Sequence, residues 1–270
     1  MTKNQYPSTF CLLGAAVLFV GAAAPSRAAL IANWTFDADL TDAVGSKDAT
    51  GFGGANFQTT TSKIGAGSAT FDGVNDYMTA GTTSDFAIGT GTMSVSFWFN
   101  LTTAATSDRF LSTGAGLNDQ DGWTFFARAG TGIDAAASDG GGRRIQGTTA
   151  SPLTGTWHLA VGVFDQPNGT VDIYLDSVLE STIALWDSGG WNGSSIDNTF
   201  VLNFGRNADG AGNYLDGYLD DVAIWDAALS QGEIDGLWNG GTGAAAAIPE
   251  PSSAALIGLA GFGLLLRRRR

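Results

Sequence analysis

The 270-residue sequence contains one cysteine, Cys11, which lies near the N-terminus. A domain without further cysteines cannot be stabilised by disulfide bonds, so it depends on a packed core or on a bound metal. Histidine is equally scarce, since His158 is the single one. A Ser-His-Asp or Cys-His catalytic arrangement would have to use it. We interpret it instead as a structural residue of the strand that begins near Trp157.

Positive charge is also in short supply. The whole chain carries 13 Lys and Arg against 26 Asp and Glu, and residues 29–248 carry 7 against 25, a formal net charge of −18 for that segment. Such a surface repels nucleic acid and anionic lipid, and it leaves many carboxylates free to bind cations. We therefore expect no nucleic-acid partner.

Glutamate is nearly absent from the same segment, where Glu180 and Glu233 are the only two. Glycoside hydrolysis requires a pair of carboxylates about 5 to 9.5 Å apart. Glu233 is placed to cap a helix, and no spacing singles out a pair among the aspartates. We expect no catalytic residues, although a polysaccharide hydrolase or lyase with an atypical Asp-based site remains an alternative.

Residues 1–28 have the three parts of a secretory signal peptide. Lys3 supplies the positive charge, residues 10–24 are apolar or small, and Ser26-Arg27-Ala28 ends the segment with a cleavage site. The pattern predicts export of a domain that begins at residue 29.

The opposite end also has three parts, which are Ile248-Pro249-Glu250-Pro251, an apolar or small-residue run over 254–266, and Arg267 to Arg270. A helical run of that length spans only about 20 Å, short of the roughly 30 Å hydrocarbon core of a bilayer. We expect residues 254–266 to associate transiently with the inner membrane, with the arginines on the cytoplasmic side. A permanent C-terminal anchor is the alternative.

This order of Pro-Glu-Pro, apolar run and arginine cluster resembles the PEP-CTERM sorting signal of Gram-negative bacteria. The resemblance implies an exosortase-type processing enzyme as a partner, and a protein that is secreted or held at the cell surface. We accordingly divide the chain into a signal peptide (1–28), one domain (29–240), a linker (241–247) and a sorting tail (248–270).

Between the two ends, apolar residues alternate as they do in β-strands. The clearest case is 92–101, where one face carries Met93, Val95, Phe97, Phe99 and Leu101. Further strands are predicted at 30–36, 109–112, 123–128, 155–164, 171–175 and 200–206, with two short strands around an Asp72-Gly73 turn within 67–80, and loops at 37–54 and 135–149. The 39 glycines and the abundant turn residues are typical of an all-β domain.

The last predicted strand, 218–225, leads into a short helix. Ser230 and Glu233 have the spacing of a capping box, which predicts that the helix begins there. Gly240 follows the last apolar position and can end the helix in a left-handed conformation.

Several of these segments resemble the laminin-G-like, concanavalin A-like families. The matching segments are Gly217 to Val222, Ala228 to Ile234, Ala69 to Tyr77 and the strand that begins at Trp157-His158. The resemblance implies an antiparallel two-sheet jelly-roll sandwich with a short C-terminal helix, in agreement with the alternating strands. One departure is Asp176-Ser177, where the family usually has Asp-Gly at a turn.

Two aspartates are candidate metal ligands. Asp37 follows the first predicted strand, and alternation in the last strand places Asp220 on the inward face with Val222 and Ile224. A carboxylate there needs a partner. Related sandwiches hold a structural calcium between the N-terminal segment and the last strand, so the resemblance implies one structural Ca²⁺ bound by Asp37 and Asp220. The alternative is a metal-free Asp220 that is bonded to backbone amides or to Arg206.

The candidate ligand-binding residues lie in a predicted loop at 184–198. Trp186 and Trp191 stand among Gly, Ser and Asn, so their rings could stack on sugars while Asn192 bonds hydroxyl groups. The alternative is that both rings pack over a sheet edge.

These features predict an exported, non-catalytic binding module at the cell surface or in the extracellular matrix of a Gram-negative bacterium. We expect it to recognise carbohydrate, such as exopolysaccharide, or an extracellular protein. A structural matrix protein without a small ligand is the second alternative, since one sequence does not show which loop residues would set ligand specificity.

Overall fold

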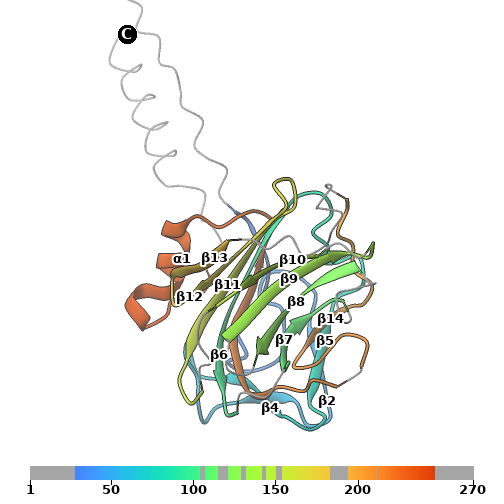
Figure 1. Ribbon diagram of the computed structural model, residues 1–270. Helices are drawn as coiled ribbons and strands as arrows, with labels where there is room; N and C mark the ends of the chain where they lie inside the picture. Colours follow the sequence, from blue (N-terminus) through green and yellow to red (C-terminus); the bar gives the residue numbers. More distant parts are fainter. Residues whose placement is uncertain are drawn as a thin grey trace, which may run out of the picture.

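The computed structural model describes residues 28–103, 107–114, 121–128, 132–141, 144–149, 154–182, 194–210 and 212–246. In this part of the chain two antiparallel sheets stack face to face, and a short helix lies over one of them (Figure 1). The predicted jelly-roll sandwich is confirmed.

The two sheets are named A and B. In spatial order, sheet A contains β13 (Val178–Thr182), β12 (Thr170–Leu175), β11 (His158–Asp165), β6 (Thr92–Leu101), β15 (Asp216–Trp225), β4 (Ser68–Asp72) and β3 (Asn56–Gln58), with β1 (Leu30–Trp34) paired to β15 as well. Sheet B contains β10 (Arg144–Thr148), β9 (Gly132–Asp139), β8 (Asp121–Arg128), β7 (Arg109–Ser112), β14 (Leu202–Phe204), β5 (Tyr77–Ala80) and β2 (Ala49–Phe52).

The main core lies between the sheets and is rich in aromatic rings. All five apolar residues predicted to share a face of the strand at 92–101 are buried in it. Phe97 of sheet A meets Phe125 of sheet B edge to face, with centroids 5.1 Å apart and planes at 84°. A side chain at Gly162 would clash with Phe125, so glycine is required in β11 at the point where the two sheets come closest.

A second apolar layer covers the outer face of sheet A. Helix α1 (Gln231–Trp238) buries Ile234 and Leu237 against it. The strand residues under the helix include Trp98, Leu159, Val161, Val163, Ala223 and Trp225.

The predicted helix ends are present with one adjustment. Ser230 accepts from the Glu233 amide, and the Glu233 carboxylate accepts from the Ser230 amide, which is the predicted capping box. The left-handed cap starts one residue earlier than predicted, because Asn239 has φ 48° and Gly240 follows with φ 63° inside the short 3₁₀ turn η1 (Asn239–Gly241).

Two segments that were predicted to be loops contain strands. The predicted loop at 37–54 contains β2, and the one at 135–149 contains most of β9 and all of β10. These strands are rich in glycine and alanine, so their apolar alternation is weak. The two strands predicted around Asp72-Gly73 exist, but β4 belongs to sheet A and β5 to sheet B, so the turn crosses between the sheets.

The predicted alternation of the last strand is interrupted by a β-bulge. The pairing of β15 with β6 shifts between Asp220 and Ala223, and Asp221 has a left-handed φ of 45°. A bulge adds one residue and reverses the side-chain parity beyond it. Asp220 therefore does not share a face with Val222 and Ile224. It pairs with Trp98 instead, on the outer side of sheet A.

Candidate functional site

Asp220 is fully buried beneath the segment that follows β3. Its Oδ2 accepts hydrogen bonds from the backbone amides of Lys63 (2.7 Å) and Ile64 (2.9 Å). Its Oδ1 is buried and has no hydrogen-bond partner in the described part of the chain. A buried carboxylate oxygen without a partner is costly, so this position favours a proton or a cation.

Asp37 reaches the same loop from the other side. Its Oδ1 accepts from the amides of Ala66 and Gly67. Gly65 lies between these contacts with φ 64°, and a side chain there would clash with the Asp37 carboxylate. The two predicted metal ligands thus hold one loop, residues 63–67, between the start of the chain and the last strand.

The electrostatics of this centre are unfavourable for charge. The pKa of Asp220 is raised to about 7, mainly by burial and to a smaller extent by the nearby charges of Asp221 and Asp37, while the hydrogen bonds from the amides of Ile64 and Lys63 act in the opposite direction. Burial also raises the pKa of Asp221, although this carboxylate accepts from Asn33 Nδ2 and from the Ala246 amide. The carboxyl groups of Asp220 and Asp221 are thus both buried here, with the charge of Asp37 nearby.

Neighbouring cations do not relieve this charge. Lys63 Nζ donates to the carbonyl of Gly241 at 2.5 Å and lies 4.5 Å from the centre of the Trp98 ring. Arg206, the partner considered in the metal-free alternative, stacks on Tyr77. The backbone-amide half of that alternative is present, but it occupies only one oxygen of Asp220.

Calcium takes six to eight oxygen ligands, and Oδ1 of Asp220 is one buried oxygen of the kind that it binds. The described residues contain no group of three or more His, Cys, Asp or Glu side chains that could hold a metal ion. Any further ligands would have to be backbone carbonyls or water.

The outer face of sheet B has a different character, because its side chains are mostly polar. These residues include Thr50, Thr79, Asn203, Ser112, Thr124, Ser138, Asp134, Arg109 and Arg128. In its middle the hydroxyl groups are buried and committed to the backbone. Ser112 Oγ donates to the Gly114 carbonyl at 2.7 Å, and Thr124 Oγ1 donates to the Leu111 carbonyl at 2.9 Å.

A charged cluster occupies one end of this face. Burial lowers the pKa of Arg109 to about 10, against the opposing effect of Asp209 and Asp134, and its guanidinium lies 4.4 Å from the centre of the Phe126 ring. Asp134 is completely buried and forms an ion pair with Arg128. The Asp134 carboxylate on the outer face of β9 is therefore engaged in a salt bridge with Arg128 of β8.

The opposite end of the same face is open. Phe52 in β2 is 41% exposed and Thr50 is exposed, while Tyr77 and Thr79 in β5 are half-buried. Among the described side chains of sheet B, this accessible region lies over the edge strand β2 and its neighbour β5.

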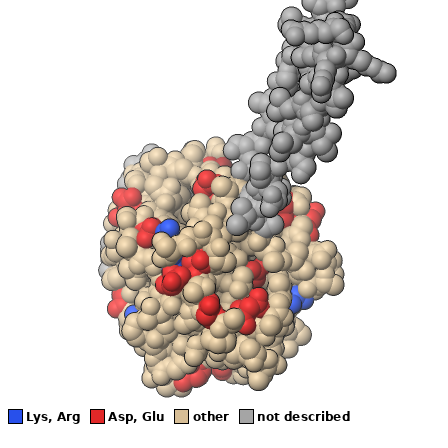
Figure 2. All heavy atoms as spheres, turned by 180° about the vertical axis from the view of Figure 1, so that it is seen from behind, with Lys and Arg blue, Asp and Glu red and all other residues tan. Residues whose placement is uncertain are grey.

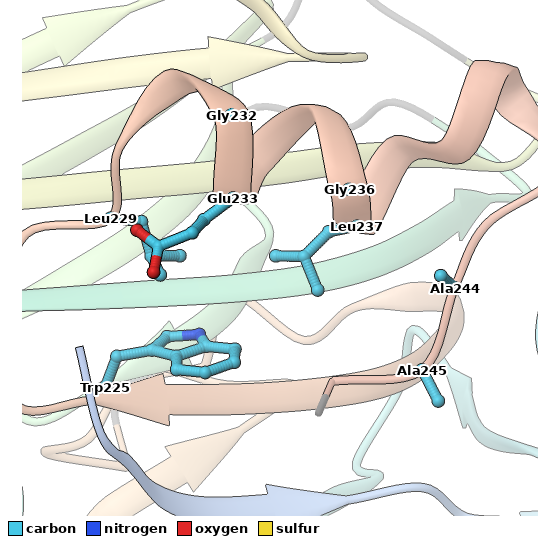
Figure 3. Close-up of a pocket in the computed structure, with 8 residues that line it drawn as sticks. All are labelled: Trp225, Leu229, Gly232, Glu233, Gly236, Leu237, Ala244 and Ala245. Carbon is cyan, nitrogen blue, oxygen red and sulfur yellow. The ribbon is translucent and has the colours of Figure 1, made fainter. Parts of the chain in front are cut away.

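A small hollow lies under α1 on the sheet A side, with a volume of about 240 Å³. Figure 3 shows the Trp225 indole as its floor, α1 above it, and Ala244 and Ala245 along one side. Gly232 and Gly236 form the part of the helix that faces it. The hollow is mainly apolar, since Glu233 is the single charged residue around it.

His158 is held by two structural hydrogen bonds. Its Nδ1 pairs with Asp176 Oδ2 at 2.6 Å, and its Nε2 contacts Thr156 Oγ1 at 2.7 Å. Asp176 and Ser177 have φ values of 51° and 71°, so this pair forms a tight turn with left-handed backbone at both positions even though the family's glycine is replaced by serine.

All three predicted ligand-binding residues, Trp186, Trp191 and Asn192, lie outside the described residues. Two other places were missed by sequence reasoning. The loop at 63–67 has no distinctive motif, and the exposed Phe52 lies in a segment predicted to be a loop.

Acidic residues dominate the charged surface. Figure 2 shows Asp and Glu spread over the face seen from behind, with few Lys or Arg among them. In the described residues, no helix is both long enough and apolar enough to cross a membrane.

Two stacked antiparallel sheets, a polar sheet face and a capped C-terminal helix define a lectin-like binding-domain architecture. Residues 72–235 match the family described as the Concanavalin A-like lectin/glucanases superfamily (Laminin_G_3), and the chain belongs to this family. Residues 247–270 match the PEP-CTERM protein-sorting motif, which indicates export to the cell surface or extracellular space of a Gram-negative bacterium.

The fold is similar to that of several solved structures. Domain 4 of AbnA, a GH43 extracellular arabinanase from Geobacillus stearothermophilus in complex with arabinotriose, has a TM-score of 0.60 and 18% identity, over 77% of this chain and 98% of that domain. The binding domain of Paraclostridial Mosquitocidal Protein 1 has a TM-score of 0.62 and 13% identity, over 78% of this chain and 52% of that one.

A third similar structure is the ligand binding domain of botulinum neurotoxin serotype D in complex with N-acetylneuraminic acid, with a TM-score of 0.59 and 18% identity, over 78% of this chain and 51% of that one. The chain thus spans about half the length of both toxin domains. At these identities the similarity concerns the fold. No curated protein matches the sequence.

Proposed function

We propose that this protein is an exported, non-catalytic module that binds carbohydrate at the cell surface or in the extracellular matrix. The observation that carries the proposal is the polar outer face of sheet B, which is open over β2 and β5 while α1 covers the outer face of sheet A. Sugars need hydrogen-bonding groups together with some apolar surface. The similar fold of an arabinanase domain crystallised with arabinotriose supports the same class of ligand.

The non-catalytic part of the proposal is supported by the state of the carboxylates. Asp134 on the sheet B face is enclosed in its pair with Arg128, and Asp220 is buried beneath a loop. A glycosidase needs an accessible acid and an accessible base or nucleophile on either side of the bond that it cleaves.

The test is retention of the full-length chain by immobilised polysaccharides, combined with chromatography of the same polysaccharides in solution. Retention with unchanged chain length supports a binding module. Shortened products would overturn the non-catalytic assignment, and lack of retention across neutral and acidic polysaccharides would favour the structural matrix protein.

The proposal includes one structural calcium ion bound by Asp37 and Asp220. In this role the ion would neutralise the buried carboxylates and tie loop 63–67 to the last strand. The partnerless Oδ1 of Asp220 supports it. A ligand present at a hundred times its dissociation constant stabilises a protein by about 2.7 kcal/mol, so added calcium should raise the melting temperature and EDTA should lower it. An equal melting temperature in both buffers would remove the metal from the proposal.

The sorting motif implies exosortase-mediated sorting. We place the exosortase-type enzyme at residues 248–270 and assign recognition of the extracellular ligand to the sandwich. Mass spectrometry of the exported protein tests this division, because a product that ends near the Pro-Glu-Pro segment is expected and an intact C-terminus would contradict it.

A further inference from the structure

Three planar groups stack in a row across the outer face of sheet B. The Arg206 guanidinium lies 3.3 Å from the centre of the Tyr77 ring. On the other side, the Tyr77 and Phe52 rings are parallel to within 8°, with centroids 4.7 Å apart. The row runs from the end of β14 through β5 to β2, which are neighbours in the sheet.

The backbone fixes the position of the last ring. Phe52 is directly opposite Tyr77 in the antiparallel pairing of β2 with β5. The turn that follows is tight, since the Phe52 carbonyl accepts from the amides of both Gly54 and Ala55. Gly53 has φ 77°, and a side chain there would collide with the Asn75 carbonyl. The ring is therefore presented from a rigid turn.

The row ends at an open edge. β2 is the terminal strand of sheet B, so no further strand follows Phe52 in the described sheet. Because Tyr77 covers one face of the Phe52 ring, the 41% exposure of this residue leaves the other face accessible to solvent. Single exposed apolar side chains are common on protein surfaces, but Phe52 differs from the exposed Val178 and Leu179 in presenting a planar ring that is already held in a stack.

Polar groups surround the open ring on the same face. Thr50 and Thr79 are paired across β2 and β5 two residues from the stack, and both are at least partly exposed. Arg206 donates through Nε to Asn203 Oδ1 at 2.9 Å. An apolar plane with hydroxyl groups beside it suits a ligand that has one apolar face and a polar edge.

We propose that the open face of Phe52 is a stacking subsite for a neutral pyranose ring of a polysaccharide. The axial C–H groups of such a sugar form a flat apolar face that continues the row as its next layer, and its hydroxyl groups reach Thr50 and Thr79. This subsite rests on the proposed carbohydrate-binding function and gives it a location.

Charge selects a neutral sugar over an acidic one. The chain has a formal net charge of −13, so an anionic polymer is repelled over most of the surface. The guanidinium of Arg206 is already placed over Tyr77 and bonded to Asn203. These two contacts fix the guanidinium as the outer layer of the stack.

The experiment compares three full-length proteins, the wild type, Phe52→Ala and the control Leu179→Ala, on immobilised neutral glucans and xylan and on acidic alginate. Leu179 in β13 is 45% exposed, which is close to the value for Phe52. It lies in sheet A, whereas Phe52 lies in sheet B. Phe52→Ala should weaken retention by a neutral polysaccharide about tenfold, the loss expected when a central aromatic contact is removed, while Leu179→Ala should retain it unchanged.

Two further variants separate ring stacking from general apolar contact, and thermal melting separates both from misfolding. Phe52→Trp keeps a planar ring and should bind at least as tightly as the wild type, whereas Phe52→Leu keeps apolar volume without a ring and should bind as weakly as Phe52→Ala. Thermal melting of each variant shows whether it is folded at the assay temperature.

The outcomes distinguish the subsite from the general function. If the wild type binds no polysaccharide, the proposed function fails and the subsite fails with it. If the wild type binds but Phe52→Ala binds equally well, or if alginate is preferred over the neutral polymers, the subsite is wrong while carbohydrate binding stands.

Discussion

Sheet A buries Trp98, Leu159, Val161 and Trp225 beneath helix α1, whereas the outer face of sheet B carries mainly polar side chains and has no helix over it in the described residues. Both sheets contribute inner faces to the same core, so the difference lies entirely in what each presents outward. One outer face is covered by packing that stabilises the fold, whereas the other is polar and is accessible over β2 and β5.

The contrast extends to the charges on each side. The buried carboxylate of Asp220 under the loop at 63–67 has one oxygen without a partner, while Asp134 on sheet B is compensated by Arg128. Asp220 therefore favours a cation or a proton, whereas the carboxylate of Asp134 is paired with Arg128.

The largest effect is expected where the helix covers sheet A. Ile234 is completely buried there, so Ile234→Ala should lower the free energy of unfolding by about 2 to 5 kcal/mol, the usual cost of such a cavity. Urea denaturation measures this loss. Val178→Ala, at a residue that is 59% exposed, is the control and should change it little. A loss below about 1 kcal/mol for Ile234→Ala would show that α1 does not seal the sheet.

Asp220 gives the next largest effect, and its direction follows from its raised pKa. In chelated protein its pKa is about 7 in the folded state against 3.8 in the unfolded state. Between those values the folded protein holds a proton on Asp220 that the unfolded chain has released. The stability that the protonated carboxyl group contributes is therefore fully present below pH 4 and is lost as the pH rises through 7. A shift of one pKa unit corresponds to about 1.4 kcal/mol. After allowance for relaxation of the site, we expect the free energy of unfolding to fall by about 2 to 3 kcal/mol as the pH rises from 4 through 7.

Asp220→Asn should flatten this pH dependence, because the amide stays neutral and its oxygen can still accept from Lys63 and Ile64. The same variant should lose the stabilisation by calcium. Glu180→Gln is the matched control, since it removes one exposed acid. If Asp220→Asn had the same pH dependence of stability as the wild type, another titratable group would have to cause it.

Sequence patterns predicted the parts of the fold that depend on regular alternation or on a local motif. The strand at 92–101 was predicted with its observed bounds because every second residue is large and apolar. The capping box of Ser230 and Glu233 was also found, since it requires only the four residues that form it.

The missed parts depend on partners that are distant in sequence. Ala135 to Ala137 form a strand, yet their small side chains show no alternation, because Phe125 fills the space between the sheets next to Gly162. The bulge at Asp221 reverses the side of Asp220, which alternation alone does not reveal. Asp37 and Asp220 were chosen through the family resemblance, and the structure brings both to one loop, whereas the pairing of Phe52 with Tyr77 was not visible in the sequence.

On the open face, substitutions should affect stability much less than under α1. Phe52→Ala removes one stacked cross-strand pair at the sheet edge, which is worth about 0.5 to 1.5 kcal/mol. The expected fall in the free energy of unfolding is therefore about 1 kcal/mol, measured by the same urea titration. A loss as large as that of Ile234→Ala would mean that the ring supports the fold and is not simply available for a ligand.

The smallest expected effect has the opposite sign and concerns the one gap in the covered face. Gly236 lies inside α1 beside the hollow over Trp225 (Figure 3), and a Cβ atom there would meet nothing within 4 Å. Because alanine favours a helix over glycine by about 0.5 to 1 kcal/mol, Gly236→Ala should raise the free energy of unfolding by that amount. Gly162→Ala is the opposing control, since its side chain would clash with Phe125 and should be clearly destabilising. If Gly236→Ala also destabilised the protein, the hollow would have to be occupied in solution, and the covered face would then share in binding.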